Sequence, residues 1–105
     1  MCGIFGLISL GEKLNINRSE FLKSLNMMEH RGPDDSGVLI NNRFAFGHRR
    51  LSIIDLTKKG RQPMISHDKS AIITYNGEIY NYKELKDFLI SNNFKFNNNT
   101  DTEVL

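Results

Sequence analysis

The sequence predicts a small α+β domain in which strands outnumber helices. Apolar runs rich in β-branched residues recur between turn-forming residues, which is the pattern of short strands. In two other segments an asparagine precedes a glutamate by three residues, which is the spacing of a helix-capping box. The length of 105 residues and the 39% hydrophobic, 25% charged composition fit one ordinary globular domain.

The first part of the chain is predicted to contain a strand and a helix. Residues 2–10 (CGIFGLISL) have the length and apolar character of a buried strand. Asn17 and Glu20 form the first capping box, so a helix is expected to begin there. The side chains at helical spacing on its apolar face are Phe21, Leu22, Leu25 and Met28. The glycine and proline of HRGPDDSG (30–37) end this helix, and its aspartates and serine predict a turn.

A hairpin and a further strand are predicted next. Residues 37–40 and 43–48 flank two asparagines, and asparagine tolerates the positive φ that a tight hairpin turn requires. Residues 50–55 (RLSIID) are expected to form another strand, followed by a loop over residues 57–63.

The last third is predicted to alternate between strand and helix. Residues 70–75 (SAIITY) are rich in strand formers, and residues 94–96 are a short strand candidate. Asn81 begins the second capped helix, whose apolar side consists of Leu85, Phe88 and Leu89. Thr100 precedes a glutamate by three residues, which predicts a third helix start close to the last residue. Because one helical turn is unstable alone, we expect the chain to be a piece of a longer domain.

Charge and composition argue against several classes of function. The net charge is only +2, and the basic clusters at 48–50 and 58–61 are short and separated, so nucleic-acid binding is not expected. The apolar N-terminal stretch has no preceding basic region and contains two glycines, which makes it a poor signal peptide. No apolar run reaches the roughly 20 residues that cross a bilayer. A lone cysteine fits a reducing compartment, so we expect a cytoplasmic protein without membrane partners.

No metal or nucleotide site is expected in this segment. The histidines His30, His48 and His67 lack metal-ligand spacing, and there is no second cysteine. Neither GxGxxG nor GxxxxGK[ST] occurs, so no phosphate-binding loop is recognisable.

Cys2 directly follows the start methionine and has two interpretations. Most lone cysteines are small buried hydrophobes, and position alone favours that interpretation. Removal of Met1 would instead give one residue both a thiol and a free α-amine. The amine, with a pKa of about 7.7–8.0, could accept the thiol proton directly or through a water. Cys2 would then be a nucleophile for acyl transfer that needs no histidine.

Three further positions are candidates for binding or catalysis. The side-chain amide of Asn76 and the N–H of Gly77 can point two donors at one atom, as an oxyanion hole does; an ordinary Asn-Gly turn is the alternative. Arg50 carries a planar fork that suits a carboxylate, and Asp101 can bind an ammonium group. Taken singly, each charge is more often an ordinary surface charge.

Six blocks together resemble a known family: MCGIFG, HRGPDDSG, HRRLSIID, QPM, NGEIYNYKEL and TDTEVL. Their order and spacing, from Cys2 to Leu105, are similar to those of the glutaminase domain of glutamine-hydrolysing asparagine synthases, which are class II (N-terminal nucleophile) glutamine amidotransferases. HRGPD and NGEIYN favour the asparagine synthase branch. Carbohydrate- and antibiotic-pathway relatives share these blocks and remain an alternative. An inactive scaffold of the same fold is a second alternative, although it would be expected to have lost an active-site residue.

The resemblance implies a role for each candidate residue. Cys2, after loss of Met1, would attack the side-chain amide of glutamine, form a γ-glutamyl thioester and release ammonia. Asn76 and Gly77 would form the oxyanion hole. Arg50 would bind the α-carboxylate of glutamine and Asp101 its α-ammonium group. The residues that would line the pocket are Leu51, Ile53, Ile54 and Glu78.

The resemblance also implies a fold and partners. The family fold is a four-layer α/β/β/α sandwich with antiparallel sheets, and residues 2–105 would be the N-terminal part of that domain, truncated at its C-terminal end. A synthetase domain that uses ATP and Mg²⁺ to make asparagine from aspartate would follow in the parent chain, which could form a homodimer. No cofactor is expected in this segment, and the segment alone is expected to be inactive.

Overall fold

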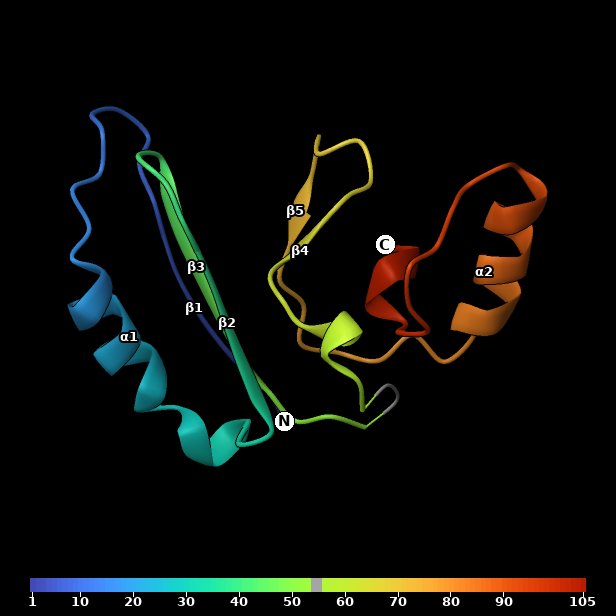
Figure 1. Ribbon diagram of the computed structural model, residues 1–105, viewed down its shortest axis with the longest axis horizontal. Coiled ribbons are helices and arrows are strands. Elements are labelled where there is room, and N and C mark those ends of the chain that lie inside the picture. Colours follow the sequence, from blue (N-terminus) through green and yellow to red (C-terminus); the bar gives the residue numbers. More distant parts are fainter. Residues whose placement is uncertain (54–55) are drawn as a thin grey trace.

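The computed structural model describes residues 1–53 and 56–105, which form a mixed arrangement of helices and antiparallel sheets (Figure 1). One sheet has the strand order β1-β3-β2 and consists of β1 (Gly3–Ile8), β2 (Asp35–Ile40) and β3 (Phe44–Arg50). The other pairs β4 (Met64–Ile65) with β5 (Ile72–Ile73). The helices are α1 (Arg18–Asn26), α2 (Tyr82–Ser91) and the one-turn 3₁₀ helices η1 (Glu29–Arg31), η2 (Lys58–Gly60) and η3 (Thr102–Val104). The predicted α+β class fits this arrangement, whereas a complete four-layer sandwich is not confirmed at this size.

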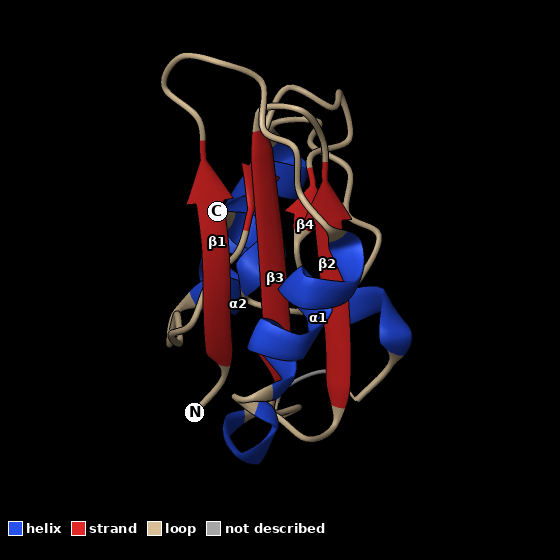
Figure 2. Ribbon diagram, turned by 90° about the vertical axis from the view of Figure 1, so that its left-hand side faces the viewer, coloured by secondary structure: helices blue, strands red, loops and turns tan. Residues whose placement is uncertain are grey.

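Helix α1 covers one face of the three-stranded sheet, as Figures 1 and 2 show from two directions. The Asn17 side chain accepts the N–H groups of Ser19 and Glu20 at 2.9 and 3.3 Å, which confirms the predicted cap. Phe21 and Leu25 are buried against the sheet, and the Phe21 ring lies 4.9 Å from that of Phe5. This interface is the hydrophobic core among the described residues, and it is small.

Strand β1 is less buried than the sequence predicts. Ile4 and Ile8 are 41% and 65% exposed, although Gly3 is buried. Side chains alternate along a strand, so Ile4 and Ile8 point away from the face on which Phe5 meets α1. Among the described residues β1 also lies at the sheet edge and pairs with β3 alone. An apolar run does not by itself distinguish a central strand from an edge strand.

The β2–β3 hairpin is present, but its turn is built differently from the prediction. Neither asparagine of the turn has a positive φ. The Asn41 side chain instead accepts the N–H groups of Arg43 and Phe44, both at 2.8 Å. The local side-chain hydrogen bonds of asparagine stabilise the turn without a left-handed residue. The hairpin extends further than expected at its other end, because Asp35 and Ser36 join β2 instead of the predicted turn.

Several predicted strands are shorter than expected or are not strands. β3 continues to Arg50, and the following residues 51–53 are not part of a strand, while residues 54–55 lie outside the described residues. Of the predicted strand 70–75 only Ile72–Ile73 pairs, with the unpredicted strand β4. Residues 94–96 have no strand partner in the described part of the chain, so that candidate is wrong.

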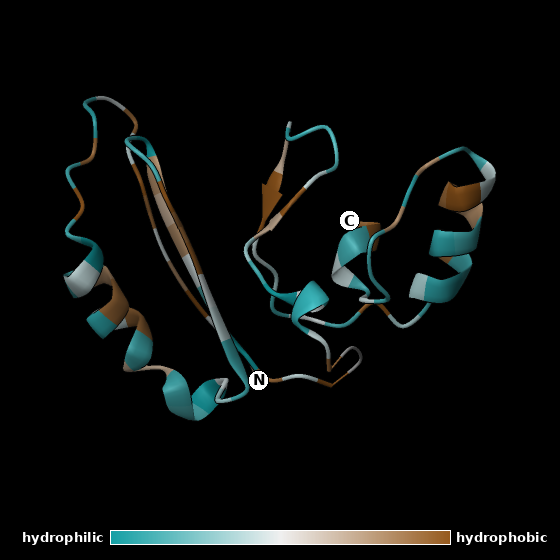
Figure 3. Ribbon diagram, in the orientation of Figure 1, coloured by the Kyte–Doolittle hydropathy of each residue, from teal (hydrophilic) through white to brown (hydrophobic). Residues whose placement is uncertain are grey.

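Helix α2 begins where the sequence predicts, but the Asn81 side chain makes no capping hydrogen bond. None of its residues is buried, and Phe88 is 65% exposed. In Figure 3 the last turn of α2 is strongly hydrophobic, whereas its first turns are mostly hydrophilic. The predicted third helix is the short η3, which starts after Asp101 and not after Thr100. The Glu103 carboxylate accepts the N–H groups of residues 97 and 98 and so does not cap this helix.

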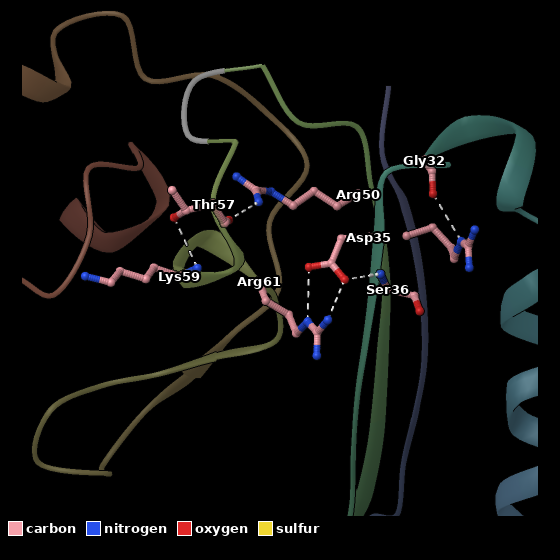
Figure 4. Close-up of polar contacts among 8 residues, drawn as sticks. Gly32, Asp35, Ser36, Arg50, Thr57, Lys59 and Arg61 are labelled. Atoms are coloured by element: carbon pink, nitrogen blue, oxygen red, sulfur yellow. Dashed lines mark hydrogen bonds and ion pairs between the residues drawn. The ribbon is translucent and has the colours of Figure 1, made fainter.

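Polar contacts connect the two sheets. The Nδ1 atom of His48 on β3 lies 3.0 Å from Oγ1 of Thr74, just after β5. Arg61 donates two hydrogen bonds to the Asp35 carboxylate, at 2.7 and 3.0 Å (Figure 4). This contact lowers the pKa of Asp35, chiefly through the hydrogen bond from Arg61. In the described part of the chain no helix is long and apolar enough to cross a membrane.

Candidate active site

The structure brings the predicted site residues together in one pocket of about 300 Å³. The predicted residues that line it are Cys2, Arg50, Leu51, Ile53, Asn76, Gly77, Glu78 and Asp101. Ile54 lies outside the described residues. Met1, Tyr80, Thr100 and Thr102 also line the pocket. Residues far apart in the sequence, such as Cys2 and Asp101, therefore line the same pocket.

The thiol of Cys2 contacts the backbone of the segment that follows β3. The N–H of Leu51 donates to Sγ at 3.3 Å, and Sγ lies 3.8 Å from the Leu51 carbonyl oxygen. Asp34 fixes this segment, because its carboxylate accepts the N–H of Ser52 at 2.7 Å. Its own N–H also donates to the Arg50 carbonyl, at 3.0 Å. These contacts place the sulfur against the backbone of Leu51.

Two side chains hold the backbone carbonyl of Cys2. Nε of Arg31 and Nδ2 of Asn76 each donate to this oxygen at 3.2 Å. Arg31 ends η1, which packs beside β3, where Arg49 forms an ion pair with Glu29 at 3.0 Å. The HRGPDDSG block therefore positions Cys2 through Arg31, a contact that sequence reasoning missed.

Asn76 and Gly77 lie in the segment between β5 and α2, next to Cys2. A Cβ atom on Gly77 would lie 2.4 Å from the hydroxyl oxygen of Tyr75. Glycine at this position therefore lets the Tyr75 ring fold over the turn. With Nδ2 of Asn76 at the Cys2 backbone, an amide donor lies at the end of the pocket that holds the thiol.

The two predicted charge-binding residues are both nearly buried. Arg50, the last residue of β3, is 7% exposed and donates to the Thr57 carbonyl at 3.0 Å (Figure 4). Asp101 is 6% exposed, and its carboxylate accepts the N–H of Ile79 at 3.0 Å. Buried charges of opposite sign in one pocket suit a ligand that itself carries both a carboxylate and an ammonium group.

A buried histidine lies behind the pocket. His48 is fully buried two residues before Arg50 on β3, and its Nε2 atom has no hydrogen-bond partner among the described residues. Burial, and secondarily the positive charge of Arg50, lower the pKa of His48 to about 4. His48 is therefore neutral at physiological pH. In the described residues no three His, Cys, Asp or Glu side chains gather as a metal site.

Comparison with known proteins gives one family match, to the glutamine amidotransferase domain, over residues 1–105. The chain is 42% identical over 107 residues to the glutamine-hydrolyzing asparagine synthetase 1 of Bacillus subtilis. It is 39% identical over 105 residues to the glutamine-hydrolyzing asparagine synthetase of Brassica oleracea, and 40% identical to enzyme 2 of Oryza sativa over the same length.

These matches cover all of this chain but little of the relatives. Each of the three alignments includes 100% of the chain and 17% of the relative. Across the curated relatives the matched share of their length extends from 14% to 23%.

Proposed function

The chain belongs to the glutamine amidotransferase domain family, and on this basis we propose that it hydrolyses free glutamine through a thioester on Cys2. One observation carries the proposal: the Cys2 thiol, the Asn76 amide and the charged groups of Arg50 and Asp101 line the same pocket. A pocket that holds two opposite charges and a thiol matches an amino acid that carries an amide on its side chain.

The proposed reaction starts after removal of Met1. The freed α-amine of Cys2 accepts the thiol proton, directly or through a water, and the sulfur attacks the side-chain amide carbon of glutamine. The developing oxyanion accepts hydrogen bonds from Nδ2 of Asn76 and the N–H of Gly77. The proton then passes to the amide nitrogen, the carbon–nitrogen bond breaks, and ammonia leaves. Water attacks the thioester with the same amine as base, which releases glutamate and the thiol.

Arg50 and Asp101 determine the substrate class in this proposal. The guanidinium of Arg50 binds the α-carboxylate, and Asp101 binds the α-ammonium group. Leu51, Ile53 and Glu78, which line the same pocket, contact the rest of the molecule.

We further propose that residues 2–105 are the N-terminal part of a longer, cytoplasmic asparagine synthetase. Its domain would be a four-layer α/β/β/α sandwich, which α1 on one sheet and the contacts between the two sheets support. The small matched share of the relatives supports a following synthetase domain. That domain would use ATP, Mg²⁺ and the released ammonia to convert aspartate to asparagine, in a chain that forms a homodimer.

The test is release of ammonia and glutamate from free glutamine by the full-length protein. The proposal predicts turnover by the wild type and none by Cys2→Ala, which should still make asparagine when ammonia is supplied. Glutamine hydrolysis that survives in Cys2→Ala would overturn it.

A further inference from the structure

We propose that Gln62 is a positioning residue that couples the oxyanion segment to the ammonium-binding segment; this rests on the function proposed above. Gln62 belongs to the QPM block, to which the family resemblance assigned no role. It immediately precedes Pro63 and the short strand β4, and it is 6% exposed. A buried amide of this kind is stable only when its donors and acceptors are paired.

Both ends of the Gln62 amide are paired with residues next to the site. Oε1 accepts the N–H of Tyr75 at 2.6 Å, and Nε2 donates to Oγ1 of Thr102 at 3.1 Å. A main-chain N–H can only donate, which fixes the orientation of the amide. Tyr75 directly precedes Asn76, and Thr102 directly follows Asp101. The Gln62 side chain thus connects the residue next to Asn76 with the residue next to Asp101. In the proposed function Asn76 and Asp101 act on opposite ends of the substrate.

The backbone around Gln62 is itself held in place. A Cβ atom on Gly37 would lie 2.0 Å from the Gln62 carbonyl oxygen, so glycine at this position of β2 permits the close approach. The two segments are also joined directly by the hydrogen bond from the N–H of Ile79 to Asp101. Gln62 therefore links both segments at a position where its backbone packs closely against the three-stranded sheet.

This placement predicts two separable kinetic effects. A shift of the Asn76 segment weakens stabilisation of the transition state and lowers kcat. A shift of Asp101 weakens binding of the substrate and raises KM. Loss of the Gln62 amide should do both, whereas loss of the Thr102 hydroxyl should mainly raise KM.

The experiment compares Gln62→Met, Thr102→Val and Thr102→Ser in the full-length protein with glutamine as substrate. Met keeps a similar volume without hydrogen bonds, Val removes only the Thr102 hydroxyl, and Ser retains it. We expect Gln62→Met to lower kcat about tenfold or more and to raise KM, because small misplacements of catalytic groups are costly. Thr102→Val should raise KM with kcat within about twofold, and Thr102→Ser, which keeps the hydroxyl, should raise KM less than Thr102→Val does. In the Gln62→Met background, Thr102→Val should add nothing further to KM.

A second readout does not depend on turnover. Hydrogen–deuterium exchange should increase over residues 75–79 and 100–102 in Gln62→Met, and over residues 100–102 alone in Thr102→Val. Leu25→Val is the control, because it loosens the α1 core at a residue that does not line the pocket, and it should change neither the kinetics nor these two segments. If Gln62→Met lowers thermal stability like Leu25→Val but leaves kcat, KM and the exchange of both segments unchanged, the coupling is wrong. If the wild type does not hydrolyse glutamine, the proposed function fails, and the exchange comparison alone still supports or overturns the coupling.

Discussion

Nδ2 of Asn76 donates to the backbone carbonyl of Cys2 at 3.2 Å, across 74 positions of sequence. The residue of the proposed nucleophile and the proposed oxyanion donor are thus joined by a hydrogen bond. The Asn76 amide has a second N–H that this bond leaves available, and the thiol belongs to the same residue as the accepting carbonyl. This contact helps to hold Cys2, the second residue of the chain, at a fixed place in the pocket.

Removal of Met1 is predicted to be required for glutamine hydrolysis. While Met1 is attached, the Cys2 nitrogen is an amide and cannot act as a base. Intact-mass measurement of active protein should show loss of one methionine, and protein that retains Met1 should not turn over glutamine. Full activity with Met1 retained would contradict the role of the amine.

Asn76→Ala is predicted to lower kcat for glutamine by roughly a hundred- to a thousandfold, the usual cost of one oxyanion-hole donor. KM should change much less, because the oxyanion forms only in the transition state. Steady-state kinetics of the full-length protein measure both. Asn42→Ala, an exposed hairpin residue, is the matched control. A sharp rise of KM at constant kcat would make Asn76 a substrate-binding residue instead.

Arg50→Leu is predicted to raise KM for glutamine strongly, because it removes the partner of the α-carboxylate from a nearly buried site. N-acetylglutamine and glutamine amide should be poor substrates of the wild type, since each lacks one of the two charges. Arg18→Leu removes an exposed arginine and should leave KM unchanged. Comparable hydrolysis of free and blocked glutamine would refute the pairing with Arg50 and Asp101.

His48 is predicted to make stability depend on pH between about 4 and 6.5. Burial lowers its pKa from an ordinary 6.5 to about 4, so the unfolded chain binds more protons in this range. The stabilisation by neutral His48 is therefore complete above pH 6.5. As the pH falls towards 4 it is lost, and the free energy of unfolding decreases by about 3 kcal/mol in all. Urea melts across this range give the free energy of unfolding at each pH. This free energy should change less steeply with pH for His48→Gln than for the wild type. His67→Gln, at an exposed position, should keep the wild-type slope; equal slopes in all three would be contrary to this account.

Residues 1–105 expressed alone are predicted to associate and to lack glutaminase activity. The core on α1 is small, α2 buries no residue, and Ile8, Phe88 and Phe94 are each at least 60% exposed. Exposed apolar surface of this kind favours association. Sedimentation and a urea melt test the prediction. A monomer that unfolds cooperatively and hydrolyses glutamine at the full rate would contradict the prediction. It would show that these exposed apolar residues need not be buried by further parts of the domain.

Local signals predicted the first half of the fold well and the second half poorly. The Asn17 cap and the positions of Phe21 and Leu25 followed from helical spacing, because a helix depends mostly on nearby residues. The extent of β5 depends instead on which segment pairs with it, and residues 64–65 gave no local strand signal. The Asn81 pattern located the start of α2, but the capping bond did not form, since spacing alone does not fix a side-chain conformation.

The residues of the pocket were predicted from motifs, whereas their supports were not. Cys2, Asn76, Arg50 and Asp101 belong to blocks with recognisable chemistry, and all four line the pocket. The contacts of Arg31 with Cys2 and of Gln62 with two segments join residues far apart in sequence, so no spacing rule reveals them. Arg31 and Gln62 do lie in the HRGPDDSG and QPM blocks, which the resemblance singled out. The blocks marked these positions but did not indicate what either side chain contacts.

Trapping of the acyl-enzyme tests the central claim most directly. Full-length protein mixed with glutamine and quenched in acid should carry a glutamyl group on the peptide that begins with Cys2, as measured by mass spectrometry. Asn76→Ala should accumulate it more slowly, and Cys2→Ala should not form it. Ammonia release by the wild type without any label on Cys2, or with the label on another residue, would contradict the account.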